Sequence, residues 1–513
     1  MNRRRFMKGI GAAAAVAVMP RTIHAKTGAG DWPKKPNVVV VITDDQGYGE
    51  LACHGNKIIK TPNIDAFGAE SVRFTAFHVS PTCAPTRTSL MTGRHEFRSG
   101  VTHTIHERER MALSSTTVAQ MLKGAGYTTG VFGKWHLGDE EPYQPQSRGF
   151  DEVFVHGAGG IGQSYSGTCG DAPGNKYFNP AIRHNGSFVK TKGFCTDIFF
   201  TQALRWIKGA KGGDKPFFAY ITTNAPHGPL ICPDEYKKPY LAAGLSAGHA
   251  AFYGMITNID ENVGILLKKL DDWKIAENTI VIFMTDNGSA QAGGGKRKKR
   301  KGKKGQPAPK PAAPAKGLFN AGMKGKKGSA NEGGTRVPCF VRLKGKTPAG
   351  VDVGALTGHI DIFPTLAEVC GGKLPDVKLD GRSFAPLLKD PKAKWADRFI
   401  FVHRGRWSKG RAAESKYGPC AVRTQRFRLV GNKDLYDIDA DPGETTNVID
   451  KHPDQVAKMR KAYDQWWSEV LPAMVNEDVP VPKDNPYKVL FIKQRASEKG
   501  IPPWPVKPAA KDV

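Results

Sequence analysis

The chain has 513 residues, 39% of them hydrophobic, and a formal net charge of +28. This length excludes a module with one small core, and the hydrophobic content predicts that most of the chain is globular. The positive charge favours polyanionic partners, namely nucleic acid, an anionic membrane or a sulfated glycan.

The first 25 residues are predicted to be an export signal. Arg3, Arg4 and Arg5 form a twin-arginine pattern, and the apolar run from Ile10 to Met19 that follows is too short to span a bilayer comfortably. Cleavage after Ala25 would remove residues 1–25, and an uncleaved N-terminal anchor is the alternative. The pattern predicts a periplasmic or secreted protein that uses the twin-arginine export machinery and has no stable membrane span.

Beyond a short linker, apolar strands alternate with helical patterns. This alternation predicts an α/β fold with a large, mixed, mostly parallel sheet between helices. The expected strands cover residues 37–43, 72–79, 128–132, 216–223, 279–285 and 336–343. The expected helices cover residues 62–70, 117–123, 196–208, 252–270 and 359–369.

After residue 380 the pattern changes to short strands at 399–403, 421–424 and 426–431, followed by a helix at 456–471. These elements predict a smaller α+β subdomain with a short antiparallel sheet. The expected organisation is therefore a catalytic domain at 36–380, a C-terminal subdomain at 381–475 and a Pro- and Lys-rich surface tail at 476–513.

The eight cysteines contain no Cys-x-x-Cys pair, which argues against a structural zinc site. Because export permits disulfides, a bridge between Cys169 and Cys195 is one expectation. Cys83 stands apart, because it lies in the polar stretch from Pro81 to Arg94. Pro85 suits the first turn of a helix and Gly93 suits its end, which places Cys83 beside a helix N-terminus that favours an anion. The alternative is a buried, unreactive cysteine.

Four predicted strands end in polar groups. Open α/β sheets bind ligands beyond the carboxyl ends of their strands, so these groups can meet although they are far apart in sequence. Three carboxylates and an amide oxygen suit Ca²⁺ or Mg²⁺. Each pair alone is more typical of a turn or cap, but two pairs at the ends of two apolar strands favour a metal site. Nearby cations and histidines would suit an anionic tetrahedral group. The four sets are Asp44-Asp45, Lys134 with His136, His227, and Asp286-Asn287.

With these motifs the chain resembles a type I, formylglycine-dependent sulfatase of the arylsulfatase type, in the alkaline phosphatase superfamily. The Cys83–Arg94 stretch resembles the family's first signature, and Gly133 to Gly138 matches the second. Further matches, in the family's order, lie at residues 224–229, 285–288, 332–334, 359–361 and 435–445.

The resemblance implies that a formylglycine-generating enzyme oxidises Cys83 before folding. One hydroxyl of the hydrated aldehyde would attack sulfur, and the other would then expel sulfate. Residues Asp44, Asp45, Asp286 and Asn287 would bind Ca²⁺, or less readily Mg²⁺, together with residue 83.

The resemblance also implies roles for the cations and histidines. Arg87 and Lys134 would hold the nucleophile and the sulfate, and His136 would assist the chemistry of the hydrate. His227 and Lys327 would contact the sulfate and the leaving oxygen, with Lys326 and Lys324 as alternatives to Lys327.

Two features depart from the family pattern. Thr86 replaces the usual serine, which affects recognition by the modifying enzyme. A segment at 293–316 holds ten Lys or Arg residues and no acid, and it is expected to be a disordered loop near the active-site rim. We hypothesise that it gathers sulfated polysaccharide.

The predicted function is hydrolysis of sulfate esters, aryl or more naturally carbohydrate, with no nucleic-acid partner. The alternatives are a phosphate or phosphonate ester hydrolase on the same fold, and a non-catalytic binder of sulfated glycans with Cys83 unmodified.

Overall fold

The computed structural model describes residues 32–292, 317–505 and 513. The predicted signal at 1–25 and the basic segment at 293–316 lie outside the described residues.

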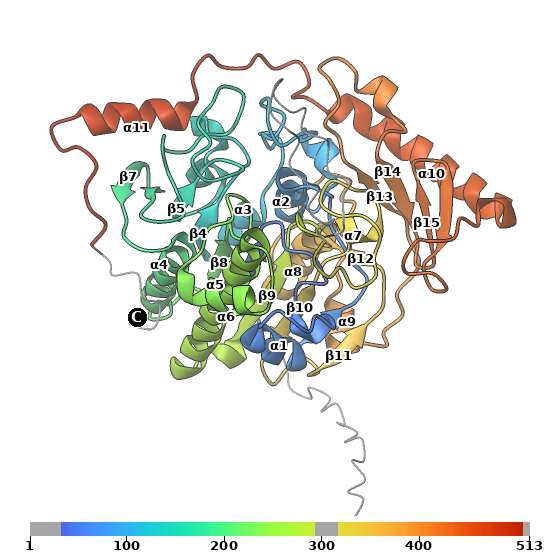
Figure 1. Cartoon of the computed structure of the whole chain (residues 1–513), viewed down its shortest axis with the longest axis horizontal. Coiled ribbons are helices and arrows are strands. Elements are labelled where there is room, and N and C mark those ends of the chain that lie inside the picture. Colours follow the sequence, from blue (N-terminus) through green and yellow to red (C-terminus); the bar gives the residue numbers. More distant parts are fainter. Residues whose placement is uncertain (1–31, 293–316, 506–512) are drawn as a thin grey trace, which may run out of the picture.

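A ten-stranded sheet organises the larger part of the molecule, in the order β11-β2-β10-β9-β1-β8-β4-β5-β6-β7. Its five central strands, from β9 to β5, run parallel, and the antiparallel pairs lie toward the two edges. The prediction of a large, mixed, mostly parallel sheet is therefore confirmed (Figure 1). The strands are β1 (Asn37–Thr43), β2 (Val72–Phe74), β4 (Thr128–Lys134), β5 (Glu152–His156), β6 (Ala181–His184), β7 (Ser187–Lys190), β8 (Phe217–Thr222), β9 (Thr279–Thr285), β10 (Cys339–Leu343) and β11 (Val351–Val353).

Strand β1 is the centre of this sheet, and helices cover both of its faces. Val38 and Val40 pack into one apolar core, whereas Val39 and Val41 pack into the other. A strand buried on both faces needs a continuous run of β-branched residues, and the sequence of β1 supplies one. Helices α2 (Cys83–Thr92), α3 (Val118–Gly124), α8 (Ile362–Cys370) and α9 (Ala385–Lys389) line the first core, and α1 (Pro62–Ala69), α4 (Cys195–Ala210) and α6 (Ala247–Asp272) line the second.

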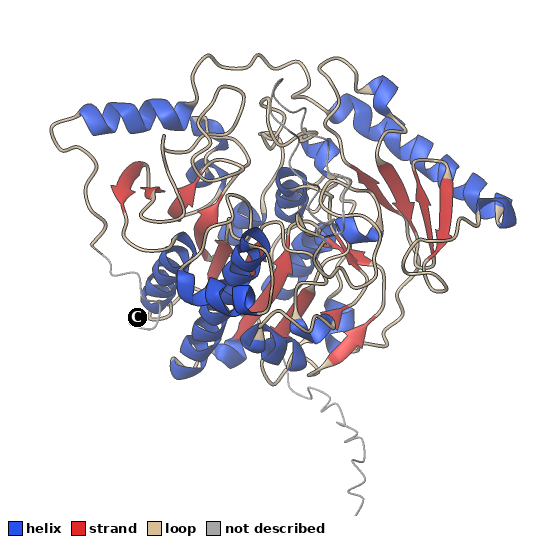
Figure 2. Ribbon diagram, in the orientation of Figure 1, coloured by secondary structure: helices blue, strands red, loops and turns tan. Residues whose placement is uncertain are grey.

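A separate four-stranded antiparallel sheet lies beside the large sheet and packs against helix α10 (Figure 2). Its core is rich in aromatic residues, including Trp407, Trp466 and Trp467. This confirms the predicted small antiparallel sheet in the C-terminal region. The sheet consists of β13 (Ile400–His403), β14 (Cys420–Arg423), β15 (Phe427–Val430) and β16 (Asp434–Asp437), and α10 covers Pro453–Val470.

One predicted strand was wrong. The strand expected at 72–79 is two strands, because a turn at Thr75 and Ala76 sends β3 (Phe77–His78) away from the large sheet to pair with β12 (Thr357–Gly358). The tail contains helix α11 (Pro486–Ala496), which packs its Tyr487 and Phe491 beside β7. The remaining helices, α5 (Asp234–Ala242) and α7 (Glu332–Thr335), are short.

The expected Cys169–Cys195 disulfide is also wrong, since both cysteines are free. The Cys169 sulfur accepts a hydrogen bond from the backbone N–H of Gly138, whereas the Cys195 thiol donates to Oδ1 of Asn224 at 3.4 Å. The two thiols therefore form hydrogen bonds to different segments of the chain.

Candidate active site

The polar groups that follow four central strands of the large sheet meet where those strands end, at their carboxyl ends. β9, β1, β8 and β4 are neighbours and run parallel, so their carboxyl ends lie side by side. Asp44, Lys134 and Asp286 are fully buried there, and His227 Nε2 lies 3.8 Å from Oδ2 of Asp45. The structure thus brings together all the candidate residues that the strand ends suggested.

Cys83 lies beside these carboxyl ends as the first residue of α2. Helix α2 is buried along its whole length and ends at Gly93, whose φ of 67° suits a residue without a side chain. Burial opposes ionisation of the Cys83 thiol, but the charges of Lys134 and Lys327 outweigh it and hold the pKa below its usual range. Residue 83 therefore lies in a dry, electropositive position that favours an anionic oxygen or sulfur.

Arg87 lies one turn further along α2 and is committed to its neighbours. Its Nε and Nη2 donate to Oδ2 of Asp286 at 3.1 and 2.8 Å, and its Nη1 donates to the Thr222 hydroxyl and to the carbonyl of Lys134. These bonds orient Asp286 and tie α2 to β8 and β4. Arg87 therefore holds Asp286 in position within the site.

The carboxylates form an incomplete cradle for a cation. Ligand atoms of Asp44, Cys83 and Asp286 all lie within 4.8 Å of one another. Oδ1 of Asp44 and Oδ1 of Asn287 are buried and accept no hydrogen bond. Buried acceptors without partners are costly, so these two oxygens are suited to bind a cation. The set of hard oxygen atoms is the type that Ca²⁺ and Mg²⁺ prefer.

Backbone conformation contributes to this cradle. Asp45 has a φ of 68°, which is unusual for a residue with a side chain. Its N–H donates to Oδ1 of Asp286, and its Oδ1 accepts from the Asn287 amide at 3.0 Å. The surrounding bonds therefore hold Asp45 in a strained conformation of the kind that clusters at functional sites.

Two lysines neutralise the carboxylates. Lys134 Nζ lies 2.6 Å from Oδ2 of Asp44, and Lys327 Nζ lies 2.6 Å from Oδ1 of Asp45. The loop that carries Lys327 is pinned by backbone bonds from Lys327 to Ser289 and from Gly328 to Pro81. Lys324, one alternative from the sequence, instead bonds to the hydroxyl of Tyr436.

The pKa values differ among the carboxyls because their surroundings differ. Burial raises the pKa of Asp44 to about 6 despite the opposing charge of Lys134. Burial and the charge of Asp44 likewise raise the pKa of Asp286 to about 6. At Asp45 the charges of Lys327 and His227 outweigh burial and hold the pKa well below its usual range. A bound cation would favour the ionised form of all three carboxyls.

The two histidines have defined tautomers when neutral. His136 Nε2 lies 2.9 Å from the carbonyl of Thr104 and so donates to it, which leaves Nδ1 as a buried acceptor without a partner. Burial and Lys134 hold the pKa of His136 well below its usual range. His227 Nδ1 donates to the carbonyl of Gly228 at 2.8 Å, which turns Nε2 toward Asp45.

His227 and Lys327 mark the side that solvent can reach. Their side chains are 20% and 19% exposed, whereas those of Lys134 and Asp44 are completely buried. A substrate anion would therefore enter past His227 and Lys327.

Sequence reasoning missed several residues that support the site. Thr104 and Thr222 hold His136 and Arg87, and nothing in their surrounding sequence signals this. Glu50 accepts from the N–H of Gly47 and from the hydroxyl of Ser289, which links the turn after β1 to the turn after β9. A signal for Glu50 existed, because it lies in the same polar turn as Asp44 and Asp45.

A family model described as sulfatase matches residues 36–372, and a second model, N-sulphoglucosamine sulphohydrolase, C-terminal, matches residues 326–467. The chain belongs to the sulfatase family. It is accordingly a sulfuric ester hydrolase, as the sequence predicted.

Two similar curated proteins are sulfatases by name, and a solved structure shares the fold. Arylsulfatase A of Homo sapiens is 28% identical over 474 residues, covering 84% of this chain and 87% of its own. N-acetylgalactosamine-6-sulfatase of Canis lupus familiaris is 29% identical over 398 residues, covering 74% of this chain and 71% of its own. The crystal structure of Ps i-CgsB in complex with k-i-k-neocarrahexaose has a TM-score of 0.72 at 26% identity, covering 84% of this chain and 93% of its own.

Phosphonate monoester hydrolase of Agrobacterium radiobacter shares the fold, with a TM-score of 0.54 at 20% identity and coverage of 86% of this chain and 96% of its own.

Among the described helices, none combines the length and the apolar character needed to cross a membrane.

Proposed function

We propose that this sulfatase hydrolyses sulfate esters of carbohydrates, with formylglycine at position 83 and Ca²⁺ held by Asp44, Asp45, Asp286 and Asn287. The observation that carries the proposal is the position of Cys83. It lies within a few ångströms of Asp44 and Asp286, beside two buried oxygens that lack any partner. When bound, the cation would withdraw negative charge from the sulfate oxygens and from residue 83.

The charges of the site favour an anionic ester. Three carboxylates face three basic side chains, those of Arg87, Lys134 and Lys327, and a divalent cation would add two positive charges in surroundings of low dielectric constant. Lys134 and Lys327 would hold the sulfate oxygens as charge develops on them.

The two histidines would handle different protons of the reaction. Nδ1 of His136 accepts no hydrogen bond from the described residues and can accept one from a hydroxyl of the formylglycine hydrate. His227 can carry a proton at Nε2, and burial holds its pKa below the usual range, so that proton is readily given up to the leaving oxygen.

The proposal is tested by expressing the chain with and without a formylglycine-generating enzyme. The fraction of Cys83 converted to formylglycine, measured by peptide mass spectrometry, and kcat/KM for an aryl sulfate should rise together. Cys83→Ala should lower kcat/KM by about 10⁴-fold or more, as removal of a nucleophile does. Cys339→Ala, which alters a buried cysteine of β10, is the matched control. An unconverted thiol in fully active protein would refute the proposal.

A substrate panel separates the alternative functions. Among sulfate, phosphate and phosphonate esters, the sulfate esters should give the highest kcat/KM. Thr86→Ser should raise the converted fraction of Cys83 if threonine at this position limits the modifying enzyme.

We further propose that residues 1–25 direct export through the twin-arginine machinery, which cleavage after Ala25 in a bacterial host would support.

A further inference from the structure

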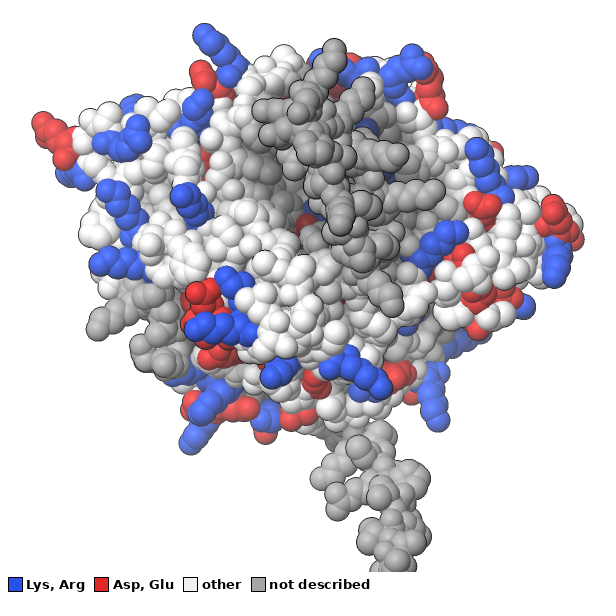
Figure 3. All heavy atoms as spheres, in the orientation of Figure 1, with Lys and Arg blue, Asp and Glu red and all other residues white. Residues whose placement is uncertain are grey.

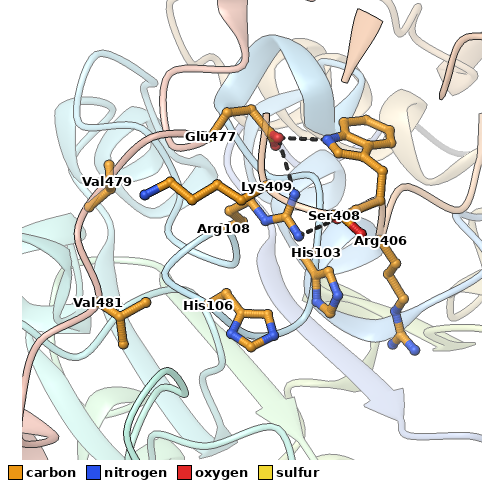
Figure 4. A pocket seen from close by; sticks show the side chains of 10 residues that line it. His103, His106, Arg108, Arg406, Ser408, Lys409, Glu477, Val479 and Val481 are labelled. Carbon is orange, nitrogen blue, oxygen red and sulfur yellow. Dashed lines mark hydrogen bonds and ion pairs between the residues drawn. The ribbon is translucent and has the colours of Figure 1, made fainter. Parts of the chain in front are cut away.

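A pocket of about 380 Å³ lies beside the candidate active site and is lined by three separate segments of the chain (Figure 4). We call it the anion pocket. Its walls come from the loop before α3, from the loop between β13 and β14, and from the chain after α10. The lining residues used below are His103, Arg108, Arg406, Lys409, Glu477 and Val481.

One pair of charges in the anion pocket is already satisfied. Arg108 donates to Oε2 of Glu477 at 3.1 Å and to the carbonyl of Trp407 at 2.7 Å. Glu477 also accepts from the indole of Trp407 and from the hydroxyl of Thr102. Arg108 therefore balances the charge of this carboxylate.

Two cations remain without a carboxylate partner among the described residues. Arg406 donates from Nη2 to the hydroxyl of Thr104 at 2.8 Å, and its Nε is buried without any partner. Lys409 is exposed, and its Nζ reaches one carbonyl, that of Asp478, at 3.4 Å. The pocket thus carries an excess of positive charge that an anionic ligand would balance.

His103 adds a donor without adding a charge. Its Nδ1 accepts from the backbone N–H groups of Thr104 and Ile105, so the proton of the neutral ring lies on Nε2. Burial and the charge of Arg108 lower the pKa of His103 to about 3, which keeps the ring neutral at ordinary pH. The opposite side of the pocket is apolar, with Val479 and Val481 on one flank of the view.

Thr104 joins the anion pocket to the active site. Its carbonyl accepts from His136, and its hydroxyl accepts from Arg406. The loop that carries Arg406 is held close, because a Cβ on Gly405 would lie 1.9 Å from the carbonyl oxygen of Thr102. The pocket and the active site are therefore connected through a single residue.

We infer that the anion pocket binds a second anionic group, a sulfate or a carboxylate, on a glycan whose reacting sulfate ester lies at residue 83. The inference rests on the proposed function and names the substrate class as a multiply charged glycan. An arginine fork and a lysine suit an oxyanion with several acceptor oxygens, and the valines suit the C–H face of a sugar ring. On the described surface of the face in Figure 3, basic and acidic side chains are interspersed.

The test compares three disaccharides: one with a single sulfate, one with two sulfates, and one with a sulfate and a uronate carboxylate. The wild-type protein should prefer a doubly charged disaccharide by about tenfold in kcat/KM, mainly through KM. Lys409→Ala should remove most of this preference, and Lys409→Glu should reverse it. High salt should weaken it, because the contact is partly exposed. Lys451→Ala, which alters an exposed lysine that does not line the pocket, should keep the wild-type ratio.

Binding to a Cys83→Ala variant, measured by calorimetry, separates the two proposals. Tighter binding of the doubly charged disaccharides, lost with Lys409→Glu, would support the pocket even if the wild-type protein cleaved none of them. Turnover of all three disaccharides at equal kcat/KM would overturn the inference and leave the sulfatase proposal intact. The comparison between the second and third disaccharides shows whether the pocket takes sulfate or carboxylate.

Discussion

Two buried clusters of charged side chains can be compared within this molecule. The first is the active-site cluster, formed by Asp44, Asp45 and Asp286 with Arg87, Lys134 and Lys327. The second, which we call the Glu332 cluster, joins α7 to the small sheet and consists of His78, Glu332, Arg423, Arg428 and Glu444.

The carboxylates of the Glu332 cluster are paired, although Nε2 of His78 forms no hydrogen bond among the described residues. Oε1 of Glu332 accepts from Arg423 at 3.0 Å and from Arg428 at 2.8 Å. Burial alone would raise the pKa of Glu332, but His78, Arg423 and Arg428 outweigh it and hold the pKa well below its usual range. Such a cluster of paired charges fixes how α7 packs against β14 and β15.

The active-site cluster has similar burial and a similar balance of charge, yet Oδ1 of Asp44 and Oδ1 of the adjoining Asn287 accept no hydrogen bond among the described residues, and Asp45 and the nearby His136 have positive φ. Conformations and orphaned atoms of this kind cost stability unless a ligand uses them. In this comparison, acceptor oxygens without partners, rather than buried charge as such, distinguish the active-site cluster from the structural one. Four predictions follow from this contrast.

The largest effect is expected for Asp44→Asn. The amide keeps the shape and can still accept from Lys134, but it removes a charge from the cation cradle. Activity should fall by about 10³-fold or more, or about 4 kcal/mol in the barrier. Urea unfolding in the presence of a chelator should show unchanged or higher stability, because burial already favours the neutral form of Asp44. Asp352→Asn, at an exposed ion pair, is the control, and wild-type activity in Asp44→Asn would contradict the assignment.

Glu332→Gln should give the opposite pattern. It leaves Arg423 and Arg428 buried without their charge partner, which should lower the free energy of unfolding by about 3–5 kcal/mol. The kcat of the remaining folded protein should change only a few-fold. Urea titration measures the first quantity, and Glu414→Gln in an exposed pair provides the comparison. A loss of activity without a loss of stability would show that the two clusters do not differ as argued.

Metal removal should affect only the active-site cluster. Ca²⁺ at 100 times its dissociation constant should stabilise the folded protein by about 2.7 kcal/mol relative to chelated protein. Differential scanning calorimetry should show this increment in Glu332→Gln and a much smaller one in Asp44→Asn. Repeating the scans with Mg²⁺ tests the preference for calcium. Equal increments in both variants would place the cation elsewhere.

The last prediction concerns pH and a third type of buried carboxyl. Burial, with a contribution from Glu107, raises the pKa of Glu109 to about 8, and Oε2 of Glu109 has no partner. The folded state therefore holds a proton that the unfolded state releases near pH 4.5. The stability from this group is complete below that pH and is lost as the pH rises toward 8, by up to about 1.4 kcal/mol per pH unit. Glu109→Gln should flatten this part of the urea-midpoint profile.

Glu332 should show the opposite sign in the same experiment. Because its pKa in the folded state is depressed, its contribution to stability is present above about pH 4.5 and is lost as the pH falls below that value. A Glu109→Gln profile that keeps the alkaline loss would show that Glu109 is ionised in the folded protein.

Part of this contrast could be predicted from sequence. The strands at 37–43 and 279–285 were predicted with their observed bounds, because long β-branched runs that end in acidic or amide residues have few other interpretations. The convergence of Asp44, Asp286 and Lys134 followed from the common direction of parallel strands. The second cluster was not predicted, because its arginines lie on short strands whose partners are about a hundred residues away.

The sequence by itself determined the fold class, the sulfatase family and the residues at the strand ends, because local apolar patterns and motif spacing encode them. Only the tertiary structure decided which oxygens lack partners, which nitrogen of His136 and of His227 is free, and that Arg406 and Lys409 line a pocket beside the site. Those properties depend on contacts between segments that no local pattern connects. Whether a cation or an oxygen has a partner depends on the residues that surround it in the folded protein.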